Sequence, residues 1–246
     1  MSGHSKWATI KHQKGIKDKT RGQIFSKLSR AISVAVADGK GEKDPNKNFK
    51  LRLAIERARG VSMPKVNIER AIDRGAGRGK EKLISVRFEG YGPGGVGVII
   101  NAITDNRQRT IQEIKNIFEK GGGSLATPGA VAYNFASRGR ILVKKEEKEE
   151  KQMLALMDID GVEDINKEKG VIKVLTEGKR LTSVRKAILN QGFEIISSSL
   201  VMVPQNLFSV KDSGKVQKII DFLERLENHQ DVQDVFTNYE KEIQFE

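Results

Sequence analysis

The spacing of the apolar residues changes near residue 80, and this change constrains the fold more than any other feature of the sequence. Before it, apolar residues recur at the period of an amphipathic helix. The pattern predicts helices over residues 21–39, 48–59 and 64–75, each ending at or beside a glycine. We expect these short helices to pack together as a small helical bundle.

After residue 80 the apolar residues alternate with polar ones, as in a half-buried strand, first at Ile84, Val86 and Phe88. Later strands and helices mix without strict alternation. We therefore expect an α+β fold with helices on one face of each sheet, and not a doubly wound parallel sheet. Further strands are expected at 96–104, 130–135, 140–143, 170–176, 193–203, 207–210 and 232–240. Helices are expected at 146–158, 181–190 and 215–228, and another helix is expected to end at 121. Residues 74–80, between the bundle and the first strand, are expected to form a flexible basic linker.

Positive charge is concentrated in the first third of the 246 residues. Residues 1–80 contain 20 Lys+Arg and 7 Asp+Glu, residues 81–140 contain 8 and 5, and residues 141–246 contain 16 and 20. The formal net charge of +12 therefore originates in residues 1–80. This asymmetry favours a polyanion bound at one end of the molecule, and the alternative is a basic face that only increases solubility.

The composition excludes several classes of protein. The chain has no cysteine, which rules out a disulfide framework, a cysteine zinc site, an iron–sulfur cluster and a thiol nucleophile. The longest apolar run, near 96–100, is far shorter than the roughly 18 residues of a membrane helix. The N-terminus has the charge of a signal peptide but not its apolar segment. We expect a cytoplasmic protein with no membrane partner.

The histidines His4, His12 and His229 offer no recognisable catalytic or metal-binding pattern. His4 and His12 lie in the basic N-terminal segment without nearby carboxylates, and His229 is expected to be isolated at the end of a helix. No pair of them has metal-ligand spacing with an acidic third ligand, and none lies in the strand–turn setting of a nucleophile. We expect no enzymatic activity, metal or cofactor.

Residues 90–95 match the G-x-G-x-x-G pattern of dinucleotide-binding loops. Such a loop connects a strand to a helix, whereas a strand pattern follows here. A β-hairpin turn, in which glycines allow positive φ angles, is the favoured interpretation.

Residues 104–110, TDNRQRT, join a strand to a helix. Capping of the helix by Asp105 or Asn106 is a sufficient structural explanation for this segment. However, Arg107 and Arg109 fall in the first helical turn, where the helix dipole disfavours cations. Arginines in this position suit contact with an anion such as a phosphate, so both interpretations stay open.

Residues 1–19 carry five lysines and lack periodicity, as expected of a mobile arm that orders on binding. Trp7 can stack on a nucleobase or pin the arm to the bundle. Lys27 and Arg30 lie off the apolar stripe of the first helix, so we expect them to point to solvent. The candidate nucleic-acid-binding residues are Lys6, Trp7, Lys11, His12, Lys14, Lys17, Lys19, Arg21, Lys27, Arg30, Arg107 and Arg109.

Four motifs, in order along the chain, resemble a known family. They are GHSKWATIKHQKGIKDKTRGQIFSKLSR within residues 1–30, EGYGPGG at 89–95, TDNRQRT at 104–110 and GGSLATPGAVAYNF at 122–135. Together they look like the YebC family, whose mitochondrial relative is the translational activator of cytochrome oxidase. The sequence departs from the usual family pattern at Gln23, Ala31, Ser124, Ala126 and Pro128.

The resemblance implies three domains around a central cavity. The first would be a helical domain of residues 1–80, the second an α+β domain of 81–136 and 205–246, and the third a domain of 137–204 inserted between those segments. The family is usually described as DNA-binding transcriptional regulators, and members are also linked to translation on the ribosome or messenger RNA.

We therefore expect a non-enzymatic nucleic-acid-binding regulator of gene expression, with DNA-binding transcriptional regulation as the first expectation. The alternative is a translation factor whose basic end binds ribosomal or messenger RNA while its acidic C-terminal third faces protein. Because no helix-turn-helix or RNP motif is present, sequence-specific readout is not expected.

Overall fold

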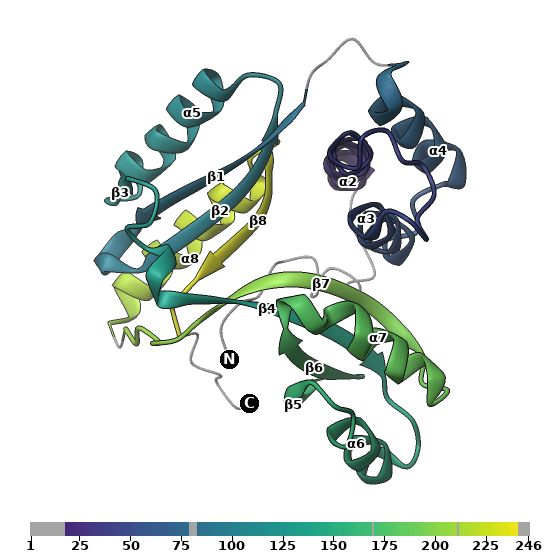
Figure 1. Ribbon diagram of the computed structural model, residues 1–246. Coiled ribbons are helices and arrows are strands. Elements are labelled where there is room, and N and C mark those ends of the chain that lie inside the picture. The colour runs from purple at the N-terminus through teal and green to yellow at the C-terminus, as the bar shows by residue number, and fades with distance from the viewer. Residues whose placement is uncertain (1–17, 79–82, 169, 211, 241–246) are drawn as a thin grey trace.

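Figure 1 shows the computed structural model, which describes residues 18–78, 83–168, 170–210 and 212–240. In these ranges, a bundle of helices precedes two antiparallel four-stranded sheets, each with its own helices. This arrangement confirms the predicted α+β class. No helix within the described ranges combines the length and the apolar character needed to cross a membrane.

The helical bundle consists of α2 (Asp18–Asp38), α3 (Phe49–Gly60) and α4 (Lys65–Asp73), close to the predicted positions. The apolar stripes of the three helices face one another and form a common core. Its fully buried members include Leu28, Ile32, Leu51, Ala58 and Ala71.

The segment after α4 is not a flexible linker over residues 74–78, as predicted, but a short π-helical turn, η1 (Arg74–Arg78). Gly75 packs directly on α2, where a Cβ atom would lie 2.3 Å from the Ser33 carbonyl oxygen. The absence of a side chain therefore serves close helix packing here. Residues 79 and 80 of the predicted linker lie outside the described residues.

The first sheet has the strand order β3-β1-β2-β8, so its last strand comes from a distant part of the chain. It contains β1 (Ile84–Tyr91), β2 (Gly97–Thr104), β3 (Ser124–Ala126) and β8 (Val232–Thr237). β1 and β2 are joined through a short 3₁₀ turn, η2 (Pro93–Gly95), in which Gly94 and Gly95 have φ angles of 73° and 87°. The prediction of a hairpin turn is confirmed.

Helices α5 (Arg107–Lys120) and α8 (Ser213–Asn228) pack on one face of the first sheet. Phe118 and Phe222 meet edge to face between them, with ring centroids 5.0 Å apart. Ile100 of β2 belongs to this core, whereas its neighbour Ile99 packs on the opposite face against residues of the second sheet. Because both faces of β2 are buried, its sequence is almost continuously apolar.

The second sheet has the order β5-β6-β4-β7 and is covered by two helices. Its strands are β4 (Phe135–Lys144), β5 (Val162–Glu168), β6 (Val171–Glu177) and β7 (Ile195–Pro204), and its helices are α6 (Glu149–Met157) and α7 (Leu181–Asn190), the latter preceded by a 3₁₀ turn, η4 (Gly178–Arg180). Leu53 of α3 joins the core of this sheet, so the bundle contacts both sheet-containing parts.

The strand predicted at 130–135 is wrong. This segment is a loop with a 3₁₀ turn, η3 (Ala132–Asn134), and β4 begins only at Phe135. The strand predicted at 207–210 is also wrong, since only an isolated bridge joins Phe208 to Tyr239. Strands β3 and β5 were not predicted. The side chain of Glu89, distant in the sequence, causes the first of these differences by binding backbone N–H groups of this loop.

Candidate nucleic-acid interface

The structure describes only some of the predicted nucleic-acid-binding residues. Lys6, Trp7, Lys11, His12, Lys14 and Lys17 lie outside the described residues, and Lys19 lies at the start of α2. Arg21 and Arg107 are exposed, and neither forms an ion pair within the described ranges. These two side chains are therefore accessible to solvent.

The expectation that Lys27 points to solvent is wrong. Lys27 is only 7% exposed, and its Nζ donates a hydrogen bond of 2.6 Å to the carbonyl oxygen of Glu227. Glu227 lies in the last turn of α8, where backbone carbonyls and the helix dipole favour a cation. Lys27 thus fastens α2 to the C-terminus of α8.

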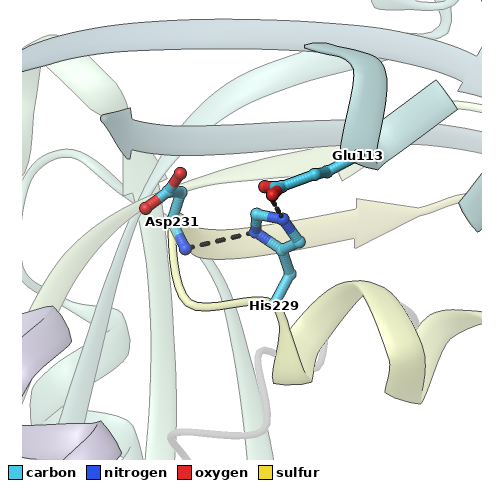
Figure 2. A group of neighbouring side chains, drawn as sticks. All are labelled: Glu113, His229 and Asp231. Atoms are coloured by element: carbon cyan, nitrogen blue, oxygen red, sulfur yellow. Dashed lines mark hydrogen bonds and ion pairs between the residues drawn. The ribbon is translucent and has the colours of Figure 1, made fainter. Parts of the chain in front are cut away.

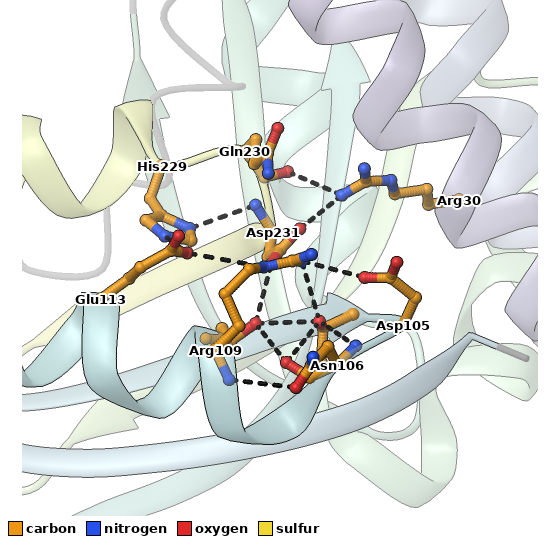
Figure 3. Close-up of polar contacts among 10 residues, drawn as sticks. Arg30, Asp105, Asn106, Arg109, Glu113, His229, Gln230 and Asp231 are labelled. Atoms are coloured by element: carbon orange, nitrogen blue, oxygen red, sulfur yellow. Dashed lines mark hydrogen bonds and ion pairs between the residues drawn. The ribbon is translucent and has the colours of Figure 1, made fainter.

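Arg30 is half-buried, so the expectation that it points to solvent is also wrong. Figure 3 shows its side chain directed at Asp231 and Gln230. Its guanidinium lies 2.5 Å from a carboxylate oxygen of Asp231, and the guanidinium of Arg109 lies 2.8 Å from the other oxygen. The side chain of Asp231 is completely buried. Arg109 of α5 therefore meets an anion, but within the described structure that anion is a carboxylate of this chain.

The TDNRQRT segment completes the same network at the N-terminus of α5. Asn106 caps the helix by accepting a hydrogen bond from the backbone N–H of Arg109, which confirms the capping interpretation. Asp105 accepts a bond of 2.9 Å from the Arg109 guanidinium. Thr110 donates a hydrogen bond of 2.7 Å to Asp231. The segment thus links α5 to the start of β8.

The charge of Asp231 is stabilised in this environment. Burial by itself raises the pKa of the Asp231 carboxyl, but hydrogen bonds from Arg109, Thr110 and Arg30 outweigh this effect and lower the pKa below its ordinary value. The same contact with Asp231 raises the pKa of the Arg109 guanidinium. The network is therefore a charged junction between α2, α5 and the start of β8. We call Arg30, Arg109, Thr110 and Asp231 the Asp231 junction.

His229 is not isolated, contrary to the prediction from the sequence. Its Nε2 lies 2.9 Å from a carboxylate oxygen of Glu113, and its Nδ1 accepts a hydrogen bond from the backbone N–H of Asp231 (Figure 2). Because Nδ1 accepts a hydrogen bond, the neutral ring carries its proton on Nε2. This N–H group donates the hydrogen bond to the Glu113 carboxylate.

The three side chains shown in Figure 2 offer ligand atoms within 4.8 Å of one another. However, both ring nitrogens of His229 take part in hydrogen bonds, and Asp231 already accepts bonds from two arginines and Thr110. Within the described residues this group forms a polar bridge between α5 and the loop after α8.

The bundle exposes further cations that the sequence analysis did not single out. They form no ion pairs within the described ranges, in contrast to Lys43 and Lys50, which pair with Asp73 and Asp38. The net charge of residues 1–80 was the signal that could have identified them. These additional exposed cations are Lys40, Lys47, Arg59, Arg70 and Arg74.

Polar contacts also hold α3 against both sheets. Arg57 forms an ion pair of 2.9 Å with Asp234 of β8. Glu56 pairs with Arg185 of α7 and accepts a hydrogen bond of 2.8 Å from Ser198 of β7. Between the bundle and the two sheets lies a cavity of about 500 Å³, with Arg57 and Asp234 in its wall. The bundle is therefore attached to the rest of the molecule at several points.

At the other end of the first sheet, Glu89 organises the loop that precedes β4. Its buried carboxylate accepts hydrogen bonds of 2.8–2.9 Å from the backbone N–H groups of Gly129, Val131 and Ala132. Burial raises the pKa of Glu89, but these three bonds outweigh it and lower the pKa. The N–H groups are consequently unavailable for the strand that the sequence pattern predicted.

Family models match nearly the whole chain. The TACO1/YebC protein N-terminal domain matches residues 5–78, and the TACO1/YebC second and third domain matches residues 83–239. The chain belongs to the TACO1/YebC family. The resemblance inferred from the four motifs is therefore confirmed.

Relatives in the TACO1/YebC family cover almost the full length of this chain. A probable transcriptional regulatory protein of Desulfitobacterium hafniense is 41% identical over 98% of this chain and 96% of its own length. One from Treponema denticola is 44% identical with the same coverage. The crystal structure of a conserved hypothetical protein from Aquifex aeolicus is 39% identical, with a TM-score of 0.86 over 98% of this chain and 100% of that chain.

Proposed function

We propose that this member of the TACO1/YebC family is a non-enzymatic regulator of gene expression that binds nucleic acid, with DNA as the first candidate. The observation that carries the proposal is the set of exposed cations on the helical bundle, at the end of the chain where the charge excess lies. Cations of this kind bind phosphates and release counterions. The names of the Desulfitobacterium and Treponema relatives agree with a regulatory role.

The residues of the Asp231 junction support a role in structure and not in catalysis. Arg30, Arg109 and Thr110 are directed at Asp231, and His229 is engaged by Glu113. A general base or nucleophile needs to be presented to a substrate. These groups are instead satisfied by one another.

A translation factor is the second candidate, because the charge of the chain is two-ended. Residues 141–246 contain more Asp+Glu than Lys+Arg, whereas residues 1–80 are strongly basic. A basic end that binds ribosomal or messenger RNA and an acidic end that faces protein would suit a factor docked on the ribosome.

Salt-dependent binding tests the proposal. The intact protein is titrated with duplex DNA and with structured RNA at increasing salt, and its co-sedimentation with ribosomes is measured in parallel. We expect the logarithm of the affinity for duplex DNA to fall linearly with the logarithm of the salt concentration, by about 0.9 per phosphate contacted. Association with ribosomes together with only weak DNA binding would favour the translation factor instead.

Charge reversal identifies the surface used. Arg70→Glu with Arg74→Glu removes two exposed cations one helical turn apart, so both affinity and the salt slope should decrease, the slope by about 1 for each phosphate that is no longer bound. A matched control, Lys179→Glu with Lys186→Glu, makes the same charge change in the second sheet's part of the chain and should bind more nearly like the parent protein. Reversal of Lys11, Lys14 and Lys17 should abolish binding. An equal decrease in both paired variants would show that only total charge matters and would contradict a specific surface.

A further inference from the structure

The cavity between the bundle and the two sheets has the size of a site for a small molecule. Its volume is about 500 Å³. Sites for small organic molecules measure roughly 300–1,000 Å³ and often lie where separate parts of a protein meet. Residues of α2, α3, β1, β2, β4, β7 and β8 line this cavity, so all three parts of the molecule contribute to it (Figure 1). A molecule bound there would contact the bundle and both sheets at once.

More than half of the residues that line the cavity are apolar. Phe236 of β8 and Val201 of β7 are buried in its wall, whereas Leu200 of β7 is 48% exposed. An exposed leucine in a cavity wall gains stability when an apolar group covers it. The wall therefore suits a ligand with an apolar body.

The charged residues of the wall are three cations and two carboxylates. Lys50 pairs with Asp38 at 2.7 Å, and Arg57 pairs with Asp234 at 2.9 Å. Each carboxylate of the wall therefore already has a cation as its partner. The third cation, Arg87, gives the wall an excess of positive charge.

Arg87 of β1 has no carboxylate bonded to it among the described residues. It is exposed, and its Nε donates a hydrogen bond of 3.2 Å to the neutral amide oxygen of Asn101. Glu89, two residues further along β1, interacts with Arg87 electrostatically but accepts its hydrogen bonds from backbone N–H groups. The guanidinium of Arg87 can therefore donate further N–H groups to an anion in the cavity.

Arg140 of β4 adds positive charge near the same wall. Burial lowers the pKa of the Arg140 guanidinium, and the positive charge of Arg57 lowers it further, whereas Asp234 and Glu168 act in the opposite direction. Arg57 and Arg140 thus lie close enough to repel each other. An anion in the cavity would reduce this repulsion.

The apolar wall and the excess cation together select the chemistry of the ligand. A nucleic-acid backbone would bring repeated phosphates against apolar side chains, which costs desolvation without enough partners. An organic acid brings one charged group and an apolar body, which is what the wall accommodates.

We propose that the cavity is a binding site for a small organic anion, with its acid group at Arg87 and its apolar body against Leu200 and Phe236. The site is separate from the exposed cations of the bundle to which nucleic-acid binding is assigned. It therefore goes beyond the proposed function and does not depend on it.

Fluorescence titration of the intact protein with anilinonaphthalene sulfonate tests the site, because this organic anion becomes fluorescent in apolar surroundings. N-phenylnaphthylamine, which has the same rings without the sulfonate, is the matched uncharged probe. We expect saturable binding of the anion at one site per chain. Octanoate should displace it, whereas octanol, which lacks the charge, and inorganic phosphate, which lacks the apolar body, should not.

Variants then locate the site. Arg87→Gln should weaken binding of the sulfonate and of octanoate by about 10-fold, since a charge-assisted hydrogen bond is lost, and leave binding of N-phenylnaphthylamine unchanged. Arg87→Lys, which keeps the charge, should bind more nearly like the parent protein. Lys186→Gln removes an exposed cation of α7 outside the cavity wall and is the control. Ser85→Trp places a large ring in the wall and should abolish binding of both probes, with circular dichroism as the check that it is folded.

Three results would overturn the inference. Undiminished binding of both probes by folded Ser85→Trp would place them elsewhere on the protein. Equal binding of the sulfonate by Arg87→Gln and Lys186→Gln, or displacement by octanol as effective as by octanoate, would remove the selectivity for an anion. The absence of saturable binding to the parent protein would remove the site. None of these results affects the proposed function, which the salt titration with nucleic acid tests separately.

Discussion

Two buried carboxylates organise opposite ends of the first sheet, and they do so with different donors. Asp231 accepts hydrogen bonds from the side chains of Arg30, Arg109 and Thr110, which come from distant parts of the chain. Glu89 accepts its bonds from the backbone of one loop. Both ends thus depend on a desolvated negative charge that its donors satisfy.

The difference in donors determines what each end does. Because side-chain donors come from separate elements, the Asp231 junction holds the basic bundle against the sheet (Figure 3). Because the donors to Glu89 are backbone groups of a single loop, they determine the shape of that loop without joining domains. One end of the sheet therefore attaches the basic bundle, and the other end presents Tyr133 on its loop.

The largest effect is expected for Asp231→Asn. This change leaves two guanidinium groups beside one another without the buried charge that joins them, so the free energy of unfolding should fall by about 3 kcal/mol. Urea unfolding measures the effect. The control Asp160→Asn breaks an ion pair at an exposed aspartate and should cost less than about 1 kcal/mol. Equal effects in the two variants would contradict the role of the Asp231 junction.

Glu89→Gln should have the next largest effect. A glutamine offers one neutral oxygen where the carboxylate accepts three N–H groups, so we expect the free energy of unfolding to fall by about 2 kcal/mol. Hydrogen exchange should accelerate at Gly129, Val131 and Ala132 while the amides of the bundle keep their protection. Unchanged exchange at those three amides would show that Glu89 does not hold the loop.

Acid should lower the free energy of unfolding by protonating Asp231 and Glu89, the carboxylates at the two ends of the first sheet. The effect of each group should be smaller than that of its substitution. The pKa values of Asp231 and Glu89 are lowered in the folded protein, so the unfolded chain binds more protons in acid. Their contribution to the free energy of unfolding is complete above the carboxyl pKa values of the unfolded chain, which are about 4. It is lost as pH falls through the lower pKa values that the two groups have in the folded protein. Each group changes the free energy of unfolding by at most about 1.4 kcal/mol per pH unit. Urea unfolding between neutral and acidic pH should show a shallower decline in Asp231→Asn and Glu89→Gln, and the same decline in all three proteins would refute this assignment.

The smallest effect on stability is expected for Tyr133→Ala. The ring is mostly exposed, so its removal should change the free energy of unfolding by no more than about 0.5 kcal/mol. Thermal and urea unfolding check this value. A larger decrease would mean that the ring contributes to packing, and the distinction between the two ends would then be weaker.

Local patterns were sufficient to predict much of the fold. The helices of the bundle and the α+β class follow from apolar spacing, and the cap at Asn106 follows from residue type at a strand-to-helix connection. The hairpin turn was recognised because a strand pattern, and not a helix pattern, follows the glycines. The inclusion of β8 in the first sheet depends on long-range pairing, for which only the family resemblance offered a signal.

The wrong predictions of residues 130–134, Lys27 and Arg30 share one physical cause, which is a partner far away in the sequence. Residues 130–134 have an apolar pattern, but the Glu89 carboxylate binds the N–H groups that a strand would use. Lys27 and Arg30 lie off the apolar stripe of α2, yet Glu227 and Asp231 bind them about 200 residues later in the chain. Helical spacing alone contains no information about such partners.

The most direct test of the account is a salt titration of the intact protein with single-stranded and duplex nucleic acid of the same sequence. The account predicts that affinity for both falls steeply and linearly with the logarithm of salt concentration, because cations of the basic bundle displace counterions. Affinity that is absent, or that does not respond to salt, would contradict it.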